Sequence, residues 1–418
     1  MARNRRNKRS FKELTNLISF KTFIILFIIF SIIIGGCLTV LWYRNNKDKE
    51  MLAKQREELD KEIKAIFVET NQNIEDSNNS KRDSLIRISA VGDILCGEEM
   101  LEDALNKEYN TYSFSHMFKN ITRFINKSDI VLGTMESNFT DEKYSGYGNR
   151  NSPKEFANAV KESGINLVSI CTNHSLDYGI EGLKDTKQYL ESIGFSTVGD
   201  RLENERAVTI KTVKNAKIAF ISYTTEIENK TKDELKSICV FDKETAKKDI
   251  EYAKENADFI IAIMHWGDSY ATKPNEKQKE IANFLIENGV GAILGNHPAV
   301  IQSMEIVKNK EDENVLVAYS LGNYIASIDN DNSKIELVLN IELRKRGEDG
   351  KVVLSKVDYT PIYALDNGEK AENRFELIDM KGVAKAYANG NTDVVDKKTY
   401  EKLIDGLKLL EKVVWGEQ

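Results

Sequence analysis

Several residue types are scarce in this chain of 418 residues, which has four cysteines, four prolines and four histidines. The cysteines show no CxxC spacing, which excludes a disulfide framework and a zinc ribbon. We expect Cys96, Cys171 and Cys239 to be small buried residues. Cys96 and Cys171 each follow an apolar run, so a contact between these two stays open. Few prolines, 24 glycines and 41% hydrophobic residues exclude a collagen-like or disordered chain and indicate a folded protein.

The chain also lacks the basic surface that a nucleic acid would need. Residues 1–22 carry seven basic side chains and one acidic one, a net charge of +6, and the whole chain has −7. The remaining residues, 23–418, therefore carry −13, which excludes nucleic acid as the partner of the main body. No GxxxxGK[ST] string occurs, so a P-loop for ATP is excluded as well.

One long apolar run is present near the N-terminus. Residues 23–43 carry no charge, and fourteen of them are Phe, Ile, Leu or Val. At about 1.5 Å per residue such a helix covers about 30 Å, the thickness of a bilayer's hydrocarbon core. The sequence predicts a single transmembrane helix, with the basic head of residues 1–22 in the cytoplasm and the rest of the chain outside the cell.

Two other interpretations of this run stay open, a cleaved signal peptide and a lipoprotein signal that ends at Cys37. The apolar run continues past Cys37 to Trp42, and no A-x-A cleavage site follows. Both features favour an uncleaved membrane anchor.

Residues 44–84 are rich in charged and amide side chains, with apolar residues at helical spacing up to Phe67. This pattern predicts a short juxtamembrane helix followed by a flexible tether. From Leu85 onward, short apolar runs alternate with amphipathic helical patterns, which is typical of an α/β fold. The expected strands are 86–91, 130–135, 166–170, 216–223, 258–264, 291–294, 315–319 and 335–343, and the expected helices are 153–163, 180–193 and 275–288.

We place the main domain at residues 85–345. A C-terminal extension, residues 346–418, contains a strand-like stretch at 351–363 and a helical pattern at 397–413. We assign no chemistry to this extension.

Most of the expected strands are followed directly by polar residues. Ligands bind at the carboxyl ends of strands in open α/β sheets, so we expect a functional site there. Carboxylate, amide and imidazole donors without a thiolate suit Mn, Fe or Zn. Three of the four histidines are among the polar residues that follow these strands, and His116 is not. The residues are Asp93, Glu136, Asn173, His174, His265, His297 and Asn323.

Six strings across residues 84–343 resemble, in order and spacing, the CapA/PgsA family of poly-γ-glutamate capsule synthesis proteins. The resemblance implies a calcineurin-like metallophosphatase fold, a β-sandwich flanked by helices with metals at strand ends, tethered outside the cell. The strings are Val91-Gly92-Asp93, Asn173-His174-Ser175-Leu176-Asp177-Tyr178-Gly179, His265-Trp266-Gly267, Pro274-Asn275-Glu276-Lys277-Gln278, His297-Pro298 and Tyr319-Ser320-Leu321-Gly322-Asn323.

The resemblance also implies the metal ligands. Asp93 matches the first metal aspartate, and Glu136 takes the place of the acid that bridges two metals. Asn173 matches the amide ligand, and His265 and His297 match the later imidazoles.

The same resemblance implies two catalytic residues and shows two positions at which this chain lacks an expected histidine. His174 matches the histidine that protonates the leaving group, and Asp177 would orient its imidazole. Leu95 stands where phosphatases usually have a second histidine, although the capsule family itself commonly has an apolar residue there. Ala299 stands where the capsule family usually continues with another histidine, and neither residue supplies a donor atom. We therefore expect one tightly bound divalent ion and a second, weak site.

The implied chemistry is metal-dependent hydrolysis at a phosphoryl or carbonyl group. The candidates for substrate binding are Arg150, Tyr178, Trp266 and Asn323, with a surface charge as the alternative for Arg150 and core packing for Tyr178 and Trp266. The expected partners are the membrane, poly-γ-glutamate or another envelope polymer, and a separate ligase with membrane subunits, since the chain has no P-loop. The other class of function is a non-catalytic accessory subunit with a structural or vestigial metal site.

Overall fold

The structure is a computed structural model that describes residues 72–73, 83–203, 206–225, 227, 229–327 and 330–416. The predicted basic head, the predicted transmembrane helix at 23–43 and most of the predicted tether at 44–84 lie outside these residues. Within the described ranges, no helix has both the length and the apolar character that crossing a bilayer requires.

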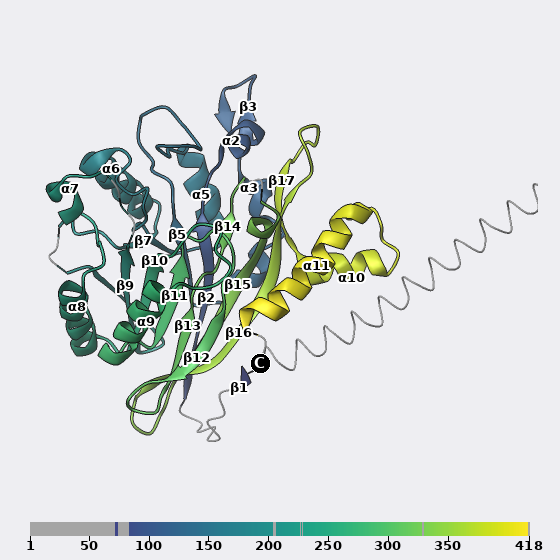
Figure 1. Ribbon diagram of the computed structural model, residues 1–418. Helices are drawn as coiled ribbons and strands as arrows, with labels where there is room; N and C mark the ends of the chain where they lie inside the picture. The colour runs from purple at the N-terminus through teal and green to yellow at the C-terminus, as the bar shows by residue number, and fades with distance from the viewer. Residues whose placement is uncertain are drawn as a thin grey trace, which may run out of the picture. The chain divides into compact units, whose positions relative to one another are not determined.

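Two β-sheets form the centre of the described chain (Figure 1). The larger has nine strands, with the path β1-β16-β15-β2-β5-β6-β7, while β14 pairs with β2 and β17 with β16. Its strands are β1 (Gln72–Asn73), β2 (Ser84–Ile94), β5 (Ile130–Met135), β6 (Leu167–Ser169), β7 (Ser196–Val198), β14 (Asn323–Ile325), β15 (Ile335–Lys345), β16 (Val352–Asp366) and β17 (Phe375–Asp379).

The smaller sheet has six strands in the order β12-β13-β11-β10-β9-β8. Its strands are β8 (Val208–Val213), β9 (Ala216–Thr224), β10 (Phe259–His265), β11 (Ala292–Asn296), β12 (Met304–Lys308) and β13 (Asn314–Ala318). A separate hairpin pairs β3 (Leu105–Asn106) with β4 (Thr111–Tyr112).

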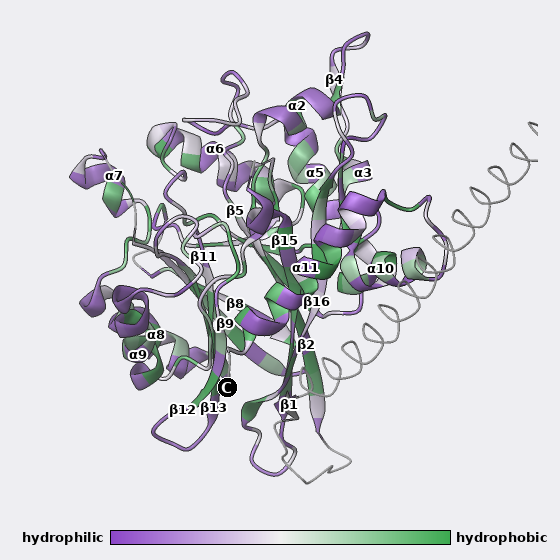
Figure 2. Cartoon of the chain, turned by 45° about the vertical axis from the view of Figure 1, so that its right-hand side comes forward, coloured by the Kyte–Doolittle hydropathy of each residue, from purple (hydrophilic) through white to green (hydrophobic). Residues whose placement is uncertain are grey.

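Helices cover the outer faces of the two sheets, with α6 to α9 on one side and α10 and α11 on the other (Figure 1). In Figure 2 the hydrophobic residues line the strands and the hydrophilic ones the outward helix faces. The helices are α2 (Glu98–Ala104), α3 (Ser115–Phe118), α4 (Thr122–Ile125), α5 (Lys154–Glu162), α6 (Gly179–Ser192), α7 (Lys232–Lys236), α8 (Lys243–Asn256), α9 (Glu276–Asn288), α10 (Met380–Ala388) and α11 (Lys397–Val414), with a 3-10 turn at Asp331–Lys334.

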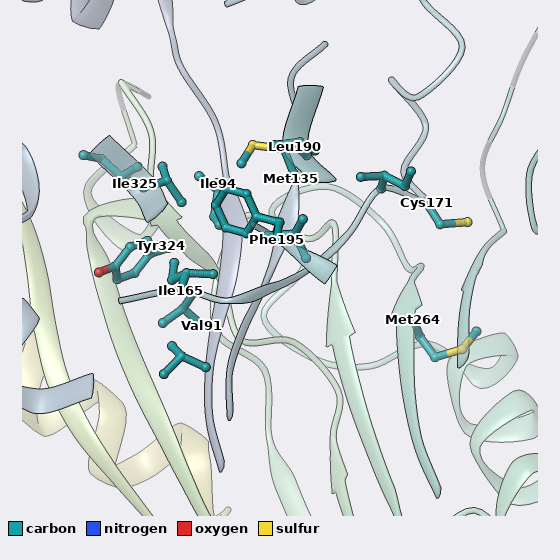
Figure 3. Packing of buried hydrophobic residues seen from close by; sticks show 14 of the residues in the cluster. Val91, Ile94, Met135, Ile165, Cys171, Leu190, Phe195, Met264, Tyr324 and Ile325 are labelled. Atoms are coloured by element: carbon teal, nitrogen blue, oxygen red, sulfur yellow. The ribbon is translucent and has the colours of Figure 1, made fainter. Parts of the chain in front are cut away.

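The central strands run parallel in both sheets. β2, β5, β6 and β7 are parallel neighbours in the first sheet, and β9, β10, β11 and β13 in the second. Such strands are buried on both faces and read as continuous apolar runs, which is why they stand out in the sequence. β10 is buried along its whole length, and the apolar residues around β2, among them Val91, Ile94 and Tyr324, pack in one core (Figure 3).

The predicted α/β class is confirmed. Each expected strand and helix from residue 86 onward is present, with ends shifted by a few residues. The strands that the sequence pattern did not predict are β7, β8, β12, β14 and β17, together with the two-residue strands, and most of these are short or lie at sheet edges. β16 pairs with β15 along its length, so residues after 346 build part of the main sheet.

The three described cysteines are buried free thiols, as expected. The structure places Cys171 beside Cys239, with the Cys171 thiol donating to the Cys239 carbonyl at 3.3 Å. Burial raises the pKa of the Cys171 thiol to about 12, so it stays protonated and unreactive.

Candidate metal centre

Three strands of the two sheets end at the same place and bring Asp93, Glu136 and His265 together. β2 carries Asp93, the end of β5 leads into Glu136, and His265 is the last residue of β10. All three side chains are buried, and one donor atom from each lies within 4.8 Å of the other two. We call these three residues the metal centre.

The atoms of the metal centre are close without being hydrogen-bonded. His265 Nε2 is 3.8 Å from Asp93 Oδ1 and 3.8 Å from Glu136 Oε1. Hydrogen bonds between such atoms are about 2.7–3.2 Å long, so these distances are too great for direct bonds. A cation held at about 2.0–2.2 Å from each donor would suit such a separation.

Several buried polar atoms of the predicted metal ligands lack a hydrogen-bond partner. They are Asp93 Oδ1, Asn173 Oδ1 and both ring nitrogens of His265. An unsatisfied buried polar atom costs about 1–3 kcal/mol, and native proteins contain few of them. Oxygen and imidazole donors of this kind fit a divalent cation of the Mn, Fe or Zn type, so the residues present match the metal that the sequence predicts.

The electrostatics of the metal centre agree with this fit. Burial raises the pKa of Asp93 well above its usual value, and the Glu136 carboxylate raises it further. Burial, with help from His297 and His174, lowers the pKa of His265 well below its usual value. His265 is therefore neutral with a lone pair to donate, and a positive charge beside Asp93 would favour its ionised form.

His297 lies at the edge of the metal centre. Its backbone N–H donates to Asp93 Oδ2 at 2.8 Å, and its ring centroid is 4.8 Å from that of His265. Its φ is +96°, a conformation that costs energy for a residue with a side chain and is concentrated at functional sites. The imidazole is 3.5 Å from Ser269 Oγ and is not one of the three donors within 4.8 Å.

The structure shows the surroundings of Leu95, which replaces a histidine of the phosphatases, and of Ala299, which replaces a histidine of the capsule family. Leu95 is buried in the core, and its backbone N–H donates to Ile325. Ala299 has a φ of +57°, and its carbonyl accepts a long bond of 3.5 Å from Asn323 Nδ2. Neither side chain offers a donor atom.

A second group of residues borders the metal centre. Nδ1 of His174 is 2.8 Å from Asp177 Oδ2, and its Nε2 is 4.0 Å from Glu136 Oε1. Because a carboxylate only accepts, Nδ1 carries the proton. The same Asp177 oxygen accepts the backbone N–H of Arg150 at 2.8 Å.

Arg150 brings a positive charge to the metal centre. Its Nη1 is 2.9 Å from Glu136 Oε2, and its side chain is 20% exposed. Its Nε is buried without an acceptor, and its carbonyl accepts bonds from the backbone and the amide of Asn138. The loop therefore holds a guanidinium with an unused donor beside the metal centre.

The remaining predicted substrate residues differ in position. Tyr178 donates its hydroxyl to the Asn149 carbonyl at 3.3 Å, next to the Arg150 loop. Trp266 is 1% exposed and donates to the Tyr319 carbonyl, which places it in the core, and Asn323 is also buried.

The sequence pattern missed one buried carboxyl near the metal centre. Glu336 on β15 is fully buried, and both its carboxyl oxygens lack a hydrogen-bond partner. Burial raises its pKa well above the usual value, and Asp93 adds to the rise. The sequence feature that could have revealed this buried carboxyl is the presence of a glutamate inside the apolar run 335–343.

Comparison with known proteins places this geometry in a family context. The family model described as "Bacterial capsule synthesis protein PGA_cap" matches residues 87–327. The capsule biosynthesis protein CapA of Bacillus anthracis is 26% identical over 300 residues, which cover 68% of this chain and 70% of that protein. The PGA biosynthesis protein CapA of Bacillus subtilis is 25% identical over 289 residues, or 66% and 72%.

Solved structures show a more distant similarity. The calcineurin-like phosphoesterase YfkN from Bacillus subtilis matches with 14% identity and a TM-score of 0.42, over 79% of this chain and 100% of that chain. A hypothetical protein from Thermus thermophilus matches with 15% identity and a TM-score of 0.41, over 66% and 98%. Both similarities are too distant to indicate a function.

Proposed function

The chain belongs to the family of bacterial capsule synthesis proteins, PGA_cap, and from this premise we propose that it is a metal-dependent hydrolase that acts in the synthesis or export of an envelope polymer such as poly-γ-glutamate. The observation that supports the hydrolase is the set of buried, unpartnered donors at Asp93, Asn173 and His265. A purely structural core would satisfy these atoms or replace them by apolar groups.

Asp93, Glu136, Asn173 and His265 would hold one tight divalent ion, with His297 beside them. Such an ion, when bound, supplies a Lewis acid and lowers the pKa of water. A second ion would bind weakly, because Leu95 and Ala299 provide no donor atom.

The chain's own residues would bind the substrate and move a proton. The guanidinium of Arg150 would bind the anionic oxygen atoms of a phosphoester, since its fork matches a phosphoryl group. His174, with Nδ1 fixed by Asp177, would hold a proton on Nε2 and give it to the oxygen of the leaving group.

The test is hydrolysis by the full chain with Mn²⁺. Phosphomonoesters, phosphodiesters and γ-linked oligoglutamate would be compared, because the residues favour a phosphoester. We expect His174→Asn to lower kcat by about 10²–10⁴-fold, the usual contribution of general acid catalysis, with metal content unchanged. Turnover equal to that of the wild type would remove His174 from the reaction.

The absent ligands at Leu95 and Ala299 favour one alternative, a non-catalytic accessory subunit with a structural metal. Polymer production in cells separates the two functions. A hydrolase needs His174, so His174→Asn should stop production or alter polymer length. An accessory subunit would tolerate His174→Asn and fail only with Glu136→Gln, which disturbs the metal.

We also propose a single-pass membrane anchor at residues 23–43, with the basic head of 1–22 inside and residues 44–418 outside the cell. The charge of +6 before an uncharged run supports this orientation. Ligation of the polymer would then belong to separate ligase and membrane subunits. Protease added to intact cells should remove epitopes after Asn45 and spare a cytoplasmic control protein; protection of the large domain would contradict this orientation.

A further inference from the structure

Two loops next to the metal centre carry strained backbone. One is the loop 266–275 between β10 and α9, and the other is the loop 297–303 between β11 and β12. In these loops Tyr270, His297 and Ala299 have φ values of +63°, +96° and +57°, a region that residues with a side chain rarely adopt. Strained backbone persists only where the surrounding structure fixes it, so other contacts must hold the two loops in place.

The side chain of Gln302 joins the second loop to the first. It is fully buried, and its Nε2 donates to the Ala271 carbonyl at 2.8 Å and to the Lys273 carbonyl at 3.2 Å. The backbone N–H of Gln302 donates to the Ser320 carbonyl at 3.1 Å, which fixes the glutamine itself. One buried side chain therefore holds the later part of the loop 266–275.

The earlier part of the same loop contacts the strained segment that contains His297. The backbone N–H of Tyr270 donates to the Pro298 carbonyl at 2.7 Å. The hydroxyl oxygen of Ser269 is 3.5 Å from His297 Nε2. The two loops are therefore linked in both directions, and the links enclose His297.

Gln278, in the first turn of α9, decides which way the Gln302 amide faces. Gln278 is 1% exposed, and its Oε1 accepts the backbone N–H of Asn275 at 2.9 Å. Because only the oxygen of an amide accepts, Gln278 Nε2 lies on the other side, where it donates to Gln302 Oε1 at 2.9 Å. The nitrogen of Gln302 must then face the carbonyls of the loop. The string 274–278, which the sequence pattern singled out, thereby gains a role.

We propose that Gln278 and Gln302, which we call the amide pair, are positioning residues that act on metal binding through His297. The inference rests on the proposed function, because it concerns the ion that the hydrolase needs. The amide pair fixes the loop 266–275, and this loop fixes the segment that holds the His297 ring, with its centroid 4.8 Å from that of His265. Removing a partner that orients the groups around a metal typically weakens metal binding by about 10–100-fold.

Competition with a metal-sensitive dye measures the Mn²⁺ affinity of the full chain and its variants. We expect Gln278→Glu to weaken Mn²⁺ binding about tenfold. The new side chain still has an oxygen for the Asn275 N–H, as in an ordinary capping box, but its second oxygen makes the Gln302 amide turn over and release the loop carbonyls. The added negative charge alone would strengthen cation binding, so charge cannot explain a loss. Gln302→Met should have at least the same effect, and Gln278→Glu decides if that variant does not fold.

The variant His297→Ala separates a positioning role from a structural one. We expect it to weaken Mn²⁺ binding about tenfold and to abolish the effect of Gln278→Glu in the double variant, because residues that act through one group are not additive. The control is Ser89→Ala. Ser89 is fully buried and bonds Asn340 Oδ1 at 3.0 Å and Ser128 Oγ at 2.7 Å, so its loss should lower the free energy of unfolding in urea without changing Mn²⁺ affinity.

Three results would overturn the proposal. Unchanged Mn²⁺ affinity in Gln278→Glu would show that the amide pair only stabilises the fold. A loss that is as large in the His297→Ala background would show that the effect does not pass through His297. In both cases Mn²⁺ binding by the wild type would leave the proposed hydrolase standing, whereas a wild type that binds no Mn²⁺ would refute the hydrolase together with this inference.

Discussion

Two buried polar clusters in this protein are built in opposite ways. In the metal centre, His265 Nε2 is 3.8 Å from the nearest oxygens of Asp93 and Glu136, and donors are left without partners. In the second cluster, Asp249 Oδ2 accepts Arg201 Nη2 at 2.5 Å and the Tyr223 hydroxyl at 2.8 Å. We call Asp249, Arg201 and Tyr223 the paired cluster.

Burial alone does not separate these clusters, since Asp93 and Asp249 are both 1% exposed. Pairing does. A satisfied buried network stabilises one conformation, whereas an unsatisfied one costs energy until something binds. The difference suggests that the paired cluster serves the fold and the metal centre serves a ligand.

We expect the largest effect from a substitution that breaks the paired cluster. Asp249→Ala would leave the Arg201 guanidinium, 12% exposed, without its carboxylate, and breaking a buried pair costs about 3–5 kcal/mol. Urea denaturation should show this loss, with metal affinity unchanged in the folded protein. Asp233→Ala, which removes an exposed pair with Lys236, is the control and should leave the unfolding free energy nearly unchanged, because water and salt screen such surface pairs.

The next effect belongs to the metal centre. Glu136→Gln keeps the shape of the side chain but removes its charge, so we expect metal affinity to fall by about 100-fold or more, above the 10–100-fold known for outer-shell changes. The free energy of unfolding without metal should change little, because the amide oxygen of glutamine can still accept a hydrogen bond from Arg150 Nη1 and the buried strands are untouched. Competition with a metal-sensitive dye measures the affinity, and Glu181→Gln on exposed α6 is the control. Full metal retention would count against Glu136 as a ligand.

We expect a smaller effect from a substitution that adds a metal ligand instead of removing one. The wild type should hold near one tight ion per chain after dialysis, since Leu95 and Ala299 lack donor atoms. Ala299→His should raise metal content toward two, with second-site affinity increased about tenfold. An unchanged content would mean that position 299 does not face the site.

The smallest effect concerns Glu336. Its raised pKa means that the folded state keeps a proton that the unfolded chain releases near pH 4.3, so stability falls as pH rises through the window from there to the folded-state pKa. Glu336→Gln should flatten that fall. At pH 7 with EDTA we expect a Tm about 2–4 °C higher, the shift typical of 1 kcal/mol; a lower Tm would show that the carboxylate is partnered.

The parallel strands and the predicted metal ligands could be predicted from the sequence, because each depends on residues that are close together along the chain. The parallel strands are continuous apolar runs, and Asp93 and His265 stand at or next to their ends, so both the strands and the predicted metal ligands follow from pattern and resemblance. The sequence pattern predicts β16 as a strand, but the pairing of β16 with β15 depends on the register between two separate segments.

The remaining features depend on contacts between distant segments. Arg150 reaches Glu136 from a loop without periodicity, and Tyr270, which has a positive φ, donates its backbone N–H to the Pro298 carbonyl. Asp249 and Arg201 are 48 residues apart, and each looks like an ordinary surface charge in sequence. No spacing rule joins such residues.

Anomalous scattering from crystals of the full chain soaked with Mn²⁺ tests the central claim most directly, because it locates the ion. We predict one strong peak bound by Asp93, Glu136, Asn173 and His265, which disappears in Glu136→Gln. A strong peak elsewhere, or none at the metal centre at millimolar Mn²⁺, would contradict the claim that these unpartnered donors are a metal site.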